Sequence, residues 1–233
     1  MHIRIGLENG DENRSVAWAL DFPGCFAYGA DSSEALVRVV PAYLAYRSWI
    51  RHHGGLPGLP EDRELDLKLV ESWNVYWIDE DFEKGPGKPY AVNAWFHEDW
   101  KPLTRAEGRR AAALLKWARE DLLAALAGLT AAELDAERPG ERWSIRGIAR
   151  HVANAEWWYL ERLGLAGVER AALPEDVLER LAAVRARLLH VLPDLEGLDL
   201  VVGRNGEFWS PRKLIRRALW HEQIGRASCR ERV

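Results

Sequence analysis

The sequence of 233 residues lacks the features that mark several specialised classes of protein. Its two cysteines, Cys25 and Cys229, are near opposite ends, which excludes the disulfide framework of a small secreted domain. A net charge of −4 excludes the basic excess of a general nucleic-acid binder. No apolar run reaches the roughly 18–20 residues that span a bilayer, and the N-terminus lacks a signal-peptide layout. We therefore expect a cytoplasmic protein that binds neither membranes nor nucleic acid.

Tryptophan is the residue type that the sequence has in excess. Twelve tryptophans are spread over both halves of the chain, which is too many for one cluster. They indicate well-filled cores or aromatic-lined pockets, and composition alone leaves both interpretations open. The length allows one or two domains, either of them large enough to bury a core.

The first hundred residues alternate apolar and polar side chains with the period of two that is typical of half-buried strands. The pattern predicts three strands, in "HIRIGL", "SVAWALDF" and "FAYGA". Asp31 then opens a helix, with Glu34 three residues later in the spacing of a capping box. A fourth strand is predicted in "ELDLKLV", and a further pair of strands in "WNVYWID" and "YAVNAWF".

The stretch "ALDFPGCFAYGADSSEAL" resembles the HicB-like antitoxin domain, through its Pro-Gly-Cys turn and its capped helix with Glu-Ala-Leu. The resemblance covers roughly the first seventy residues and implies a small β-β-β-α-β domain. The pattern contains no following helix-turn-helix or ribbon-helix-helix segment, so the DNA-binding arm of an antitoxin is missing from it. We therefore interpret residues 1–101 as a reused fold rather than a working antitoxin.

From Pro102 the apolar period changes from 2 to about 3.6, which is the period of an α-helix. Four helical segments follow, and Ser144 and Ser210 are candidate N-caps for the second and the fourth. Short to moderate connections predict a four-helix bundle over residues 102–225, with no internal repeat. The expected fold class is α+β with two domains, a small sheet domain followed by the bundle.

Two of the seven histidines are on the predicted inward faces of bundle helices. His151 shares a helix face with Ile148 and Ala155, and His221 shares one with Ala218. A buried imidazole needs a hydrogen-bond partner, a second histidine or a metal ion. Spacing alone favours a hydrogen-bonded core histidine over a ligand, and it leaves the metal alternative open.

The words "WSIRGIARHVANAEWWYLERL" and "GEFWSPRKLIRRALWHE" resemble the DinB/YfiT-like bundle proteins, and the likeness covers about residues 103–222. That superfamily includes metal-dependent thiol transferases, and the resemblance implies one divalent metal held by three histidines. One ligand belongs to a W-S-x-x-x-I-x-x-H word that ends at His151. The other two form an H-x-x-x-H pair, whose first member matches His221 and whose second falls on Gly225. Two of the three ligands are therefore present.

The resemblance also implies the cofactors, the reaction and the partners. Zn, Ni or Fe is the expected metal, and a low-molecular-weight thiol is the expected second cofactor. Metal binding would favour the thiolate, and the protein would transfer it to a small-molecule substrate. We expect Asn154 and Trp158 to contact that substrate, and Glu156 and Glu161 to be solvated surface acids. A homodimer is the oligomer that the resemblance suggests.

The chain ends in "IGRASCRERV", where the composition changes abruptly and the apolar face is lost. We interpret residues 226–233 as a non-native or disordered tail, with a natural degenerate member of the superfamily as the alternative. The incomplete histidine set also leaves a second function open. In that reading the protein is a non-enzymatic interaction or scaffold protein, with a HicB-like partner-binding domain and a degenerate bundle site.

Overall fold

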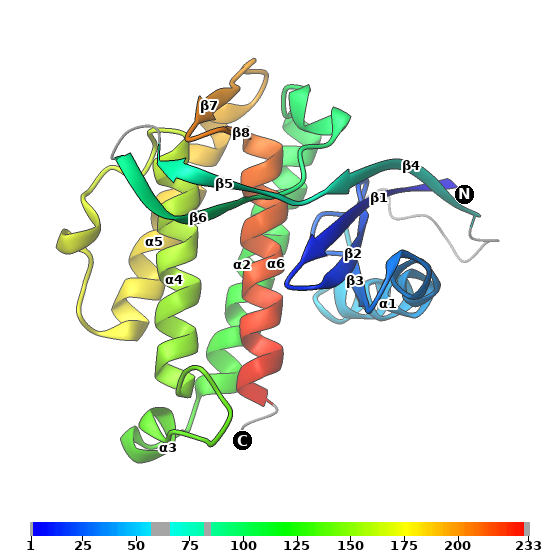
Figure 1. Cartoon of the computed structure of the whole chain (residues 1–233). Coiled ribbons are helices and arrows are strands. Elements are labelled where there is room, and N and C mark those ends of the chain that lie inside the picture. Colours follow the sequence, from blue (N-terminus) through cyan, green and yellow to red (C-terminus); the bar gives the residue numbers. More distant parts are fainter. Residues whose placement is uncertain (1, 57–65, 82–84, 231–233) are drawn as a thin grey trace. The chain divides into compact units, whose positions relative to one another are not determined.

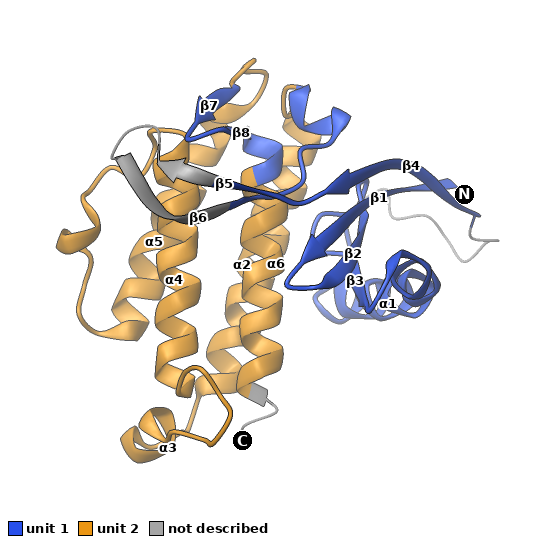
Figure 2. Cartoon of the chain, viewed as in Figure 1, with its two compact units in different colours: residues 1–101, 201–213 blue, residues 102–200, 214–233 orange. Residues whose placement is uncertain are grey.

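A computed structural model of the chain describes residues 2–56, 66–81 and 85–230, without the side chains of residues 79–90 and 230. The described chain divides into two compact units, drawn in different colours in Figure 2. Unit 1 contains residues 1–101 and 201–213, and unit 2 contains residues 102–200 and 214–233. The fold is mixed α and β, with strands in the N-terminal part and long helices in the C-terminal part (Figure 1).

Unit 1 is built around a four-stranded sheet in the order β3-β2-β1-β4. Neighbouring strands are antiparallel except β1 and β4, which are parallel and therefore need a crossover connection. The chain between them also contains β2 and β3, and helix α1 connects β3 to β4, so the predicted β-β-β-α-β order of elements is present. The bounds are β1 His2–Asp11, β2 Arg14–Ala19, β3 Phe26–Gly29, α1 Ser32–His52, β4 Asp66–Asn74, β5 Tyr76–Asp81, β6 Gly85–Val92 and the 3-10 helix η1 His97–Trp100.

Helix α1 begins as its sequence predicts. The Asp31 side chain accepts a hydrogen bond from the Glu34 backbone N–H, and the Glu34 carboxylate accepts one from the Ala30 N–H. The helix buries Val39, Tyr43 and other apolar residues, and it contains Pro41 without interruption.

The residues that return to unit 1 late in the chain form a small hairpin, β7 Val202–Arg204 and β8 Glu207–Trp209. Its two-residue turn has Asn205 and Gly206 at positive φ, which is why an Asn-Gly pair suits it. Directly after the hairpin, the fully buried Lys213 donates to the Glu207 carboxylate at 2.6 Å and to the Asn93 carbonyl at 3.3 Å. Lys213 thus joins two parts of unit 1 that are separated in sequence by unit 2.

Unit 2 is helical. In Figure 1 its long helices α2, α4, α5 and α6 lie side by side. The described bounds are α2 Arg105–Leu126, α3 Ala131–Asp135, α4 Ile145–Arg162, η2 Arg170–Ala172, α5 Val177–Val191, η3 Leu192–Leu195 and α6 Pro211–Arg230. Ser144 caps α4, and the Ser210 hydroxyl accepts a hydrogen bond from the Lys213 N–H in the first turn of α6. Both predicted caps are therefore present.

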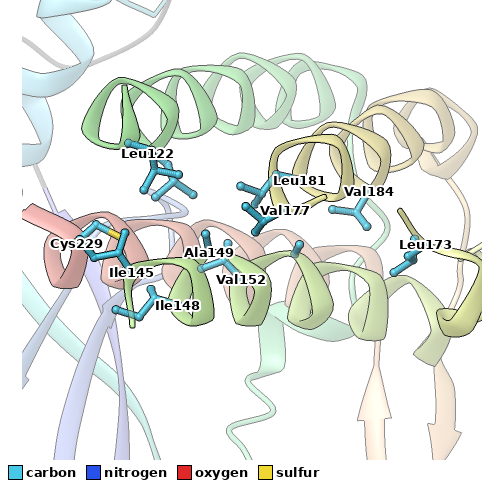
Figure 3. Packing of buried hydrophobic residues seen from close by; sticks show 12 residues of the cluster. Leu122, Ile145, Ile148, Ala149, Val152, Leu173, Val177, Leu181, Val184 and Cys229 are labelled. Carbon is cyan, nitrogen blue, oxygen red and sulfur yellow. The ribbon is translucent and has the colours of Figure 1, made fainter. Parts of the chain in front are cut away.

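The apolar core of unit 2 extends to the end of α6 (Figure 3). Cys229 is fully buried against a cluster that includes Leu122, Ile145 and Val152. Residues 226–230 continue the helix, so the disordered alternative predicted for residues 226–233 does not hold for them, while the non-native alternative stays a prediction and residues 231–233 are outside the described chain. The arginine-rich composition of this segment suggested that it has no apolar face, but Cys229 packs into the core.

Four buried charges occupy the interior of unit 2, one from each long helix: Arg119, Glu156, Arg185 and Glu222, which we call the ion cluster. Arg119 Nε donates to Glu222 Oε1 at 2.5 Å, and Arg185 Nε donates to Glu156 Oε1 at 2.8 Å. Each arginine Nη2 reaches both carboxylates. The two positive and two negative charges therefore compensate each other.

The residues of the ion cluster reveal an internal repeat that the apolar periodicity of the sequence did not indicate. The same 66-residue interval separates Arg119 from Arg185, and Glu156 from Glu222. It also separates Leu115 from Leu181, whose carbonyls accept hydrogen bonds from Arg185 and Arg119 respectively. Two further pairs have this interval, Trp143 with Trp209 and Ser144 with Ser210. Unit 2 is thus built from two similar helix pairs, α2 with α4 and α5 with α6, and the expectation of no internal repeat is wrong.

Candidate metal centre

His151 on α4 and His221 on α6 face each other within unit 2. Their Nε2 atoms are 3.1 Å apart, and their ring centroids are 5.0 Å apart. Both side chains are partly buried rather than fully enclosed. The fold therefore brings together the two histidines that were predicted as metal ligands, although 70 positions separate them in the chain.

Aromatic side chains surround the two imidazoles. The Trp143 ring stacks on His151 with 4.5 Å between the centroids and 29° between the planes. On the other side, the Tyr159 hydroxyl oxygen is 2.5 Å from His221 Nδ1, and Tyr159 is buried. One part of the tryptophan excess therefore lines this site.

Burial favours the neutral form of both histidines. Burial lowers the pKa of His151 below its usual value, and the positive charge of Arg142 lowers it further. Burial likewise lowers the pKa of His221 well below its usual value, with added contributions from Arg217 and His151. A neutral imidazole has one nitrogen lone pair available to a metal ion.

The distance between the two Nε2 atoms suits a shared metal ion. Two nitrogens that are each about 2.1 Å from a tetrahedral zinc are roughly 3.4 Å apart, and an angle nearer 90° brings them closer. The observed 3.1 Å lies in this range. Imidazole nitrogen is a suitable ligand for Zn, Ni and Fe. His151 and His221 therefore fit as two ligands of one divalent ion, although within the described ranges no three His, Cys, Asp or Glu side chains converge.

Gly225 is placed where a third ligand could reach the pair. A Cβ atom built on Gly225 would be 2.5 Å from Val152 Cγ2 and 3.8 Å from Ile148 Cγ2. A side chain at position 225 would therefore point toward α4, one turn beyond His221 and beside the turn that carries His151. The same short distance means that Val152 would have to move to admit it.

The acids nearest in sequence to the two histidines are engaged elsewhere. Glu222 and Glu156 are fully buried in the ion cluster, so the prediction that Glu156 is a solvated surface acid is wrong. Burial alone would raise the pKa of Glu156, but the charges and hydrogen bonds of Arg185 and Arg119 outweigh it and lower the pKa. Glu161 is only partly buried, with an oxygen 3.7 Å from Arg162 Nε.

The two residues predicted to contact substrate have protein partners on α4 and α5. The Asn154 Oδ1 atom accepts a hydrogen bond from Arg180 Nη1 at 2.6 Å. The guanidinium of Arg162 is 4.5 Å from the centroid of the Trp158 ring, which packs edge-on against Tyr159 at 5.6 Å. Trp158 thus packs against Tyr159, which contacts His221. The substrate contacts of Asn154 and Trp158 stay predictions.

Sequence reasoning missed Trp143 and Tyr159 as partners of the histidines. Trp143 directly precedes the N-cap Ser144 and is the first residue of the W-S-x-x-x-I-x-x-H word that ends at His151, which was the available signal for it. Tyr159 lies about two turns after His151 on α4. His190, by contrast, is exposed in the last turn of α5.

The family comparison selects the same part of the chain. A sequence model of the DinB superfamily matches residues 114–225, which include both histidines. The C-terminal domain is DinB-like. This superfamily is generally metal-binding, in agreement with the fit of the histidine pair.

The other comparisons add no further relatives of the DinB-like domain. No curated protein and no solved structure matches the chain. The HicB-like resemblance of residues 1–101 finds no support in these comparisons, since the family match begins at residue 114. None of the described helices is long and apolar enough to cross a membrane.

Proposed function

We propose that the DinB-like domain binds a divalent metal ion through His151 Nε2 and His221 Nε2 and acts as a metal-dependent enzyme, a thiol S-transferase or a relative of one. The observation that carries the proposal is the 3.1 Å separation of the Nε2 atoms of two imidazoles from different helices. The placement of both histidines within the residues that match the DinB superfamily supports it.

A divalent ion at this pair would lower the pKa of a bound thiol and so supply the nucleophilic thiolate at neutral pH. The protein's own groups would orient the reactants. His151 and His221 would present one nitrogen each, and the rings of Trp143 and Trp158 would offer apolar surface near them. The proposed reaction is addition of the thiol to an electrophilic alkene: the S–H bond and the π bond of the alkene break, a sulfur–carbon bond forms, and the proton released by the thiol ends on the adjacent carbon.

A thiol-consumption assay tests the activity. Full-length protein loaded separately with Zn, Ni or Fe is incubated with a panel of low-molecular-weight thiols and an α,β-unsaturated carbonyl compound. Adduct formation above the uncatalysed rate is expected, together with its loss in His151→Ala and its retention in the exposed control His190→Ala. Equal rates in His151→Ala and the unaltered protein would contradict the assignment.

A second candidate is a non-enzymatic interaction protein. It is favoured by the presence of only two converging histidines among the described residues and by an exposed apolar stripe on α1. That stripe contains Val37, Val40 and Leu44, of which Val37 is 74% exposed. A stoichiometric protein partner that is lost when Val37 and Leu44 are changed to Lys, in protein that binds no metal, would favour this function.

A further inference from the structure

The hydroxyl group of Tyr159 contacts Nδ1 of His221, the ring nitrogen that does not face His151. The Tyr159 hydroxyl oxygen is 2.5 Å from Nδ1, while the Nε2 atom of the same ring faces His151 at 3.1 Å. Tyr159 is only 3% exposed and comes from α4, the helix that also carries His151. One helix therefore supplies both a facing imidazole and a hydroxyl group to the ring of His221.

The two contacts of His221 constrain where its single proton lies. A neutral imidazole has one N–H and one lone pair, so a proton on Nδ1 leaves the Nε2 lone pair available, and the reverse arrangement blocks it. If Nδ1–H donates to the Tyr159 oxygen, Nε2 can accept from His151 in the metal-free protein or coordinate an ion. A metal-binding histidine usually donates its second ring N–H to an oxygen acceptor in this way.

The two similar helix pairs of unit 2 share many residues at the 66-residue interval, but they differ at the positions of His151, His221 and Tyr159. At the 66-residue interval, the capping serines and the ion cluster are retained, as are two arginine pairs, Arg146 with Arg212 and Arg150 with Arg216. The positions that form the histidine site differ. The counterparts of His221 and Tyr159 are Ala155 and Gly225, and the counterpart of His151 is Arg217. Tyr159 thus belongs with the histidines, among the positions where the two helix pairs have diverged.

We infer that Tyr159 is a positioning residue that accepts the Nδ1–H of His221 and so fixes the tautomer whose Nε2 lone pair faces His151. The inference rests on the proposed metal site, because the orientation matters for function only if Nε2 is a ligand. Its structural part stands independently, since the tautomer can be measured without metal.

The tautomer is tested by two-bond 1H–15N NMR correlation spectra of full-length protein at pH 7.5 without metal, assigned with His221→Gln. The expected spectrum shows His221 protonated at Nδ1, and Tyr159→Phe is expected to change the Nδ1 and Nε2 shifts. Tyr46→Phe is the matched control, because it removes another hydrogen-bonded tyrosine hydroxyl from unit 1, where Tyr46 donates to the Pro23 carbonyl. A proton on Nε2 in the unaltered protein, or unchanged shifts in Tyr159→Phe, would overturn the inference.

Zinc affinity tests the functional part. Loss of such an outer partner typically weakens metal binding about 10- to 100-fold, so Tyr159→Phe is expected to raise the Kd for zinc by that factor, with an unchanged Kd in Tyr46→Phe. An unchanged Kd in Tyr159→Phe would refute the positioning role. If the unaltered protein itself binds no zinc, the proposed metal site fails, and the NMR result still decides which atom of His221 carries the proton.

Discussion

At the scale of single residues, the site depends on imidazoles that stay neutral. Burial is the first cause of the lowered pKa at both His151 and His221, and nearby arginines act in the same direction. Protonation would create two positive rings, whose Nε2 atoms are 3.1 Å apart, near Arg217 and Arg142, so acid should act against both folding and metal binding.

The pKa of His221 predicts how stability depends on pH. Because the folded-state pKa is well below the unfolded value of 6.5, the unfolded chain binds more protons between these two values. The contribution of neutral His221 is therefore fully present above pH 6.5 and decreases as the pH falls below it, by up to about 1.4 kcal/mol per pH unit. Urea unfolding of metal-free protein at pH 7.5 and 5.5 should show a larger loss than in His221→Gln. Parallel losses in the two proteins would argue against a depressed pKa.

A histidine introduced at position 225 tests the geometry around the pair. Gly225→His combined with Val152→Ala, which removes the Cγ2 atom that would lie 2.5 Å from the new Cβ, should add a third nitrogen ligand. Zinc binding by titration calorimetry is expected to tighten at least about tenfold, or roughly 1.4 kcal/mol, relative to Gly225→Ala with Val152→Ala. Equal affinities in the two double variants would show that position 225 does not face the pair.

At the scale of helices, the ion cluster fixes how α2, α4, α5 and α6 are placed against one another. Each carboxylate is bonded to both arginines, and the two arginines also donate to the backbone carbonyls of Leu181 and Leu115. Glu222 directly follows His221 on α6, so the ion cluster also fixes the position of His221 along the axis of α4.

Removal of one carboxylate from the ion cluster should be costly. Glu156→Gln is expected to destabilise the folded protein by about 3–5 kcal/mol, because two buried arginines would then share one counter-charge. The pseudo-symmetric arrangement predicts a similar loss for Glu222→Gln, and almost none for Glu161→Gln, whose side chain is partly exposed. Chemical unfolding measures all three. A loss below 1 kcal/mol in Glu156→Gln would contradict a compensated buried cluster.

Helix boundaries and caps were largely predictable from sequence, and the ion cluster was not. Ser144 and Ser210 sit at helix starts because their local chemistry requires nothing from distant residues. Glu156, by contrast, has the sequence context of a solvated acid, and only its meeting with Arg119 and Arg185 explains its burial. Tyr159 was missed for the same reason, since its partner is on another helix.

At the scale of the whole chain, the two units are interleaved in sequence. The change of period after Lys101 coincides with the first division between them, but residues 201–213 belong to unit 1 again. Periodicity could not predict this return, because it depends on the long-range contacts of Lys213 with Asn93 and Glu207.

Lys213 provides a test of that return. Lys213→Met leaves the buried Glu207 carboxylate without its cation, and a loss of about 3–5 kcal/mol is expected. Adding Glu207→Gln should recover part of this loss, because the unpaired charge is then removed. Hydrogen exchange of the β7–β8 amides reports the effect locally. Equal protection in Lys213→Met and the unaltered protein would contradict the anchoring role of Lys213.

The most direct measurement is the metal content of the full-length protein after exposure to Zn, Ni or Fe and removal of excess ion. One bound ion per chain is predicted for the unaltered protein and for His190→Ala, with most of it lost in His151→Ala and in His221→Ala. Retention of a full equivalent by both of these variants, or the absence of any bound ion in the unaltered protein, would contradict the metal site.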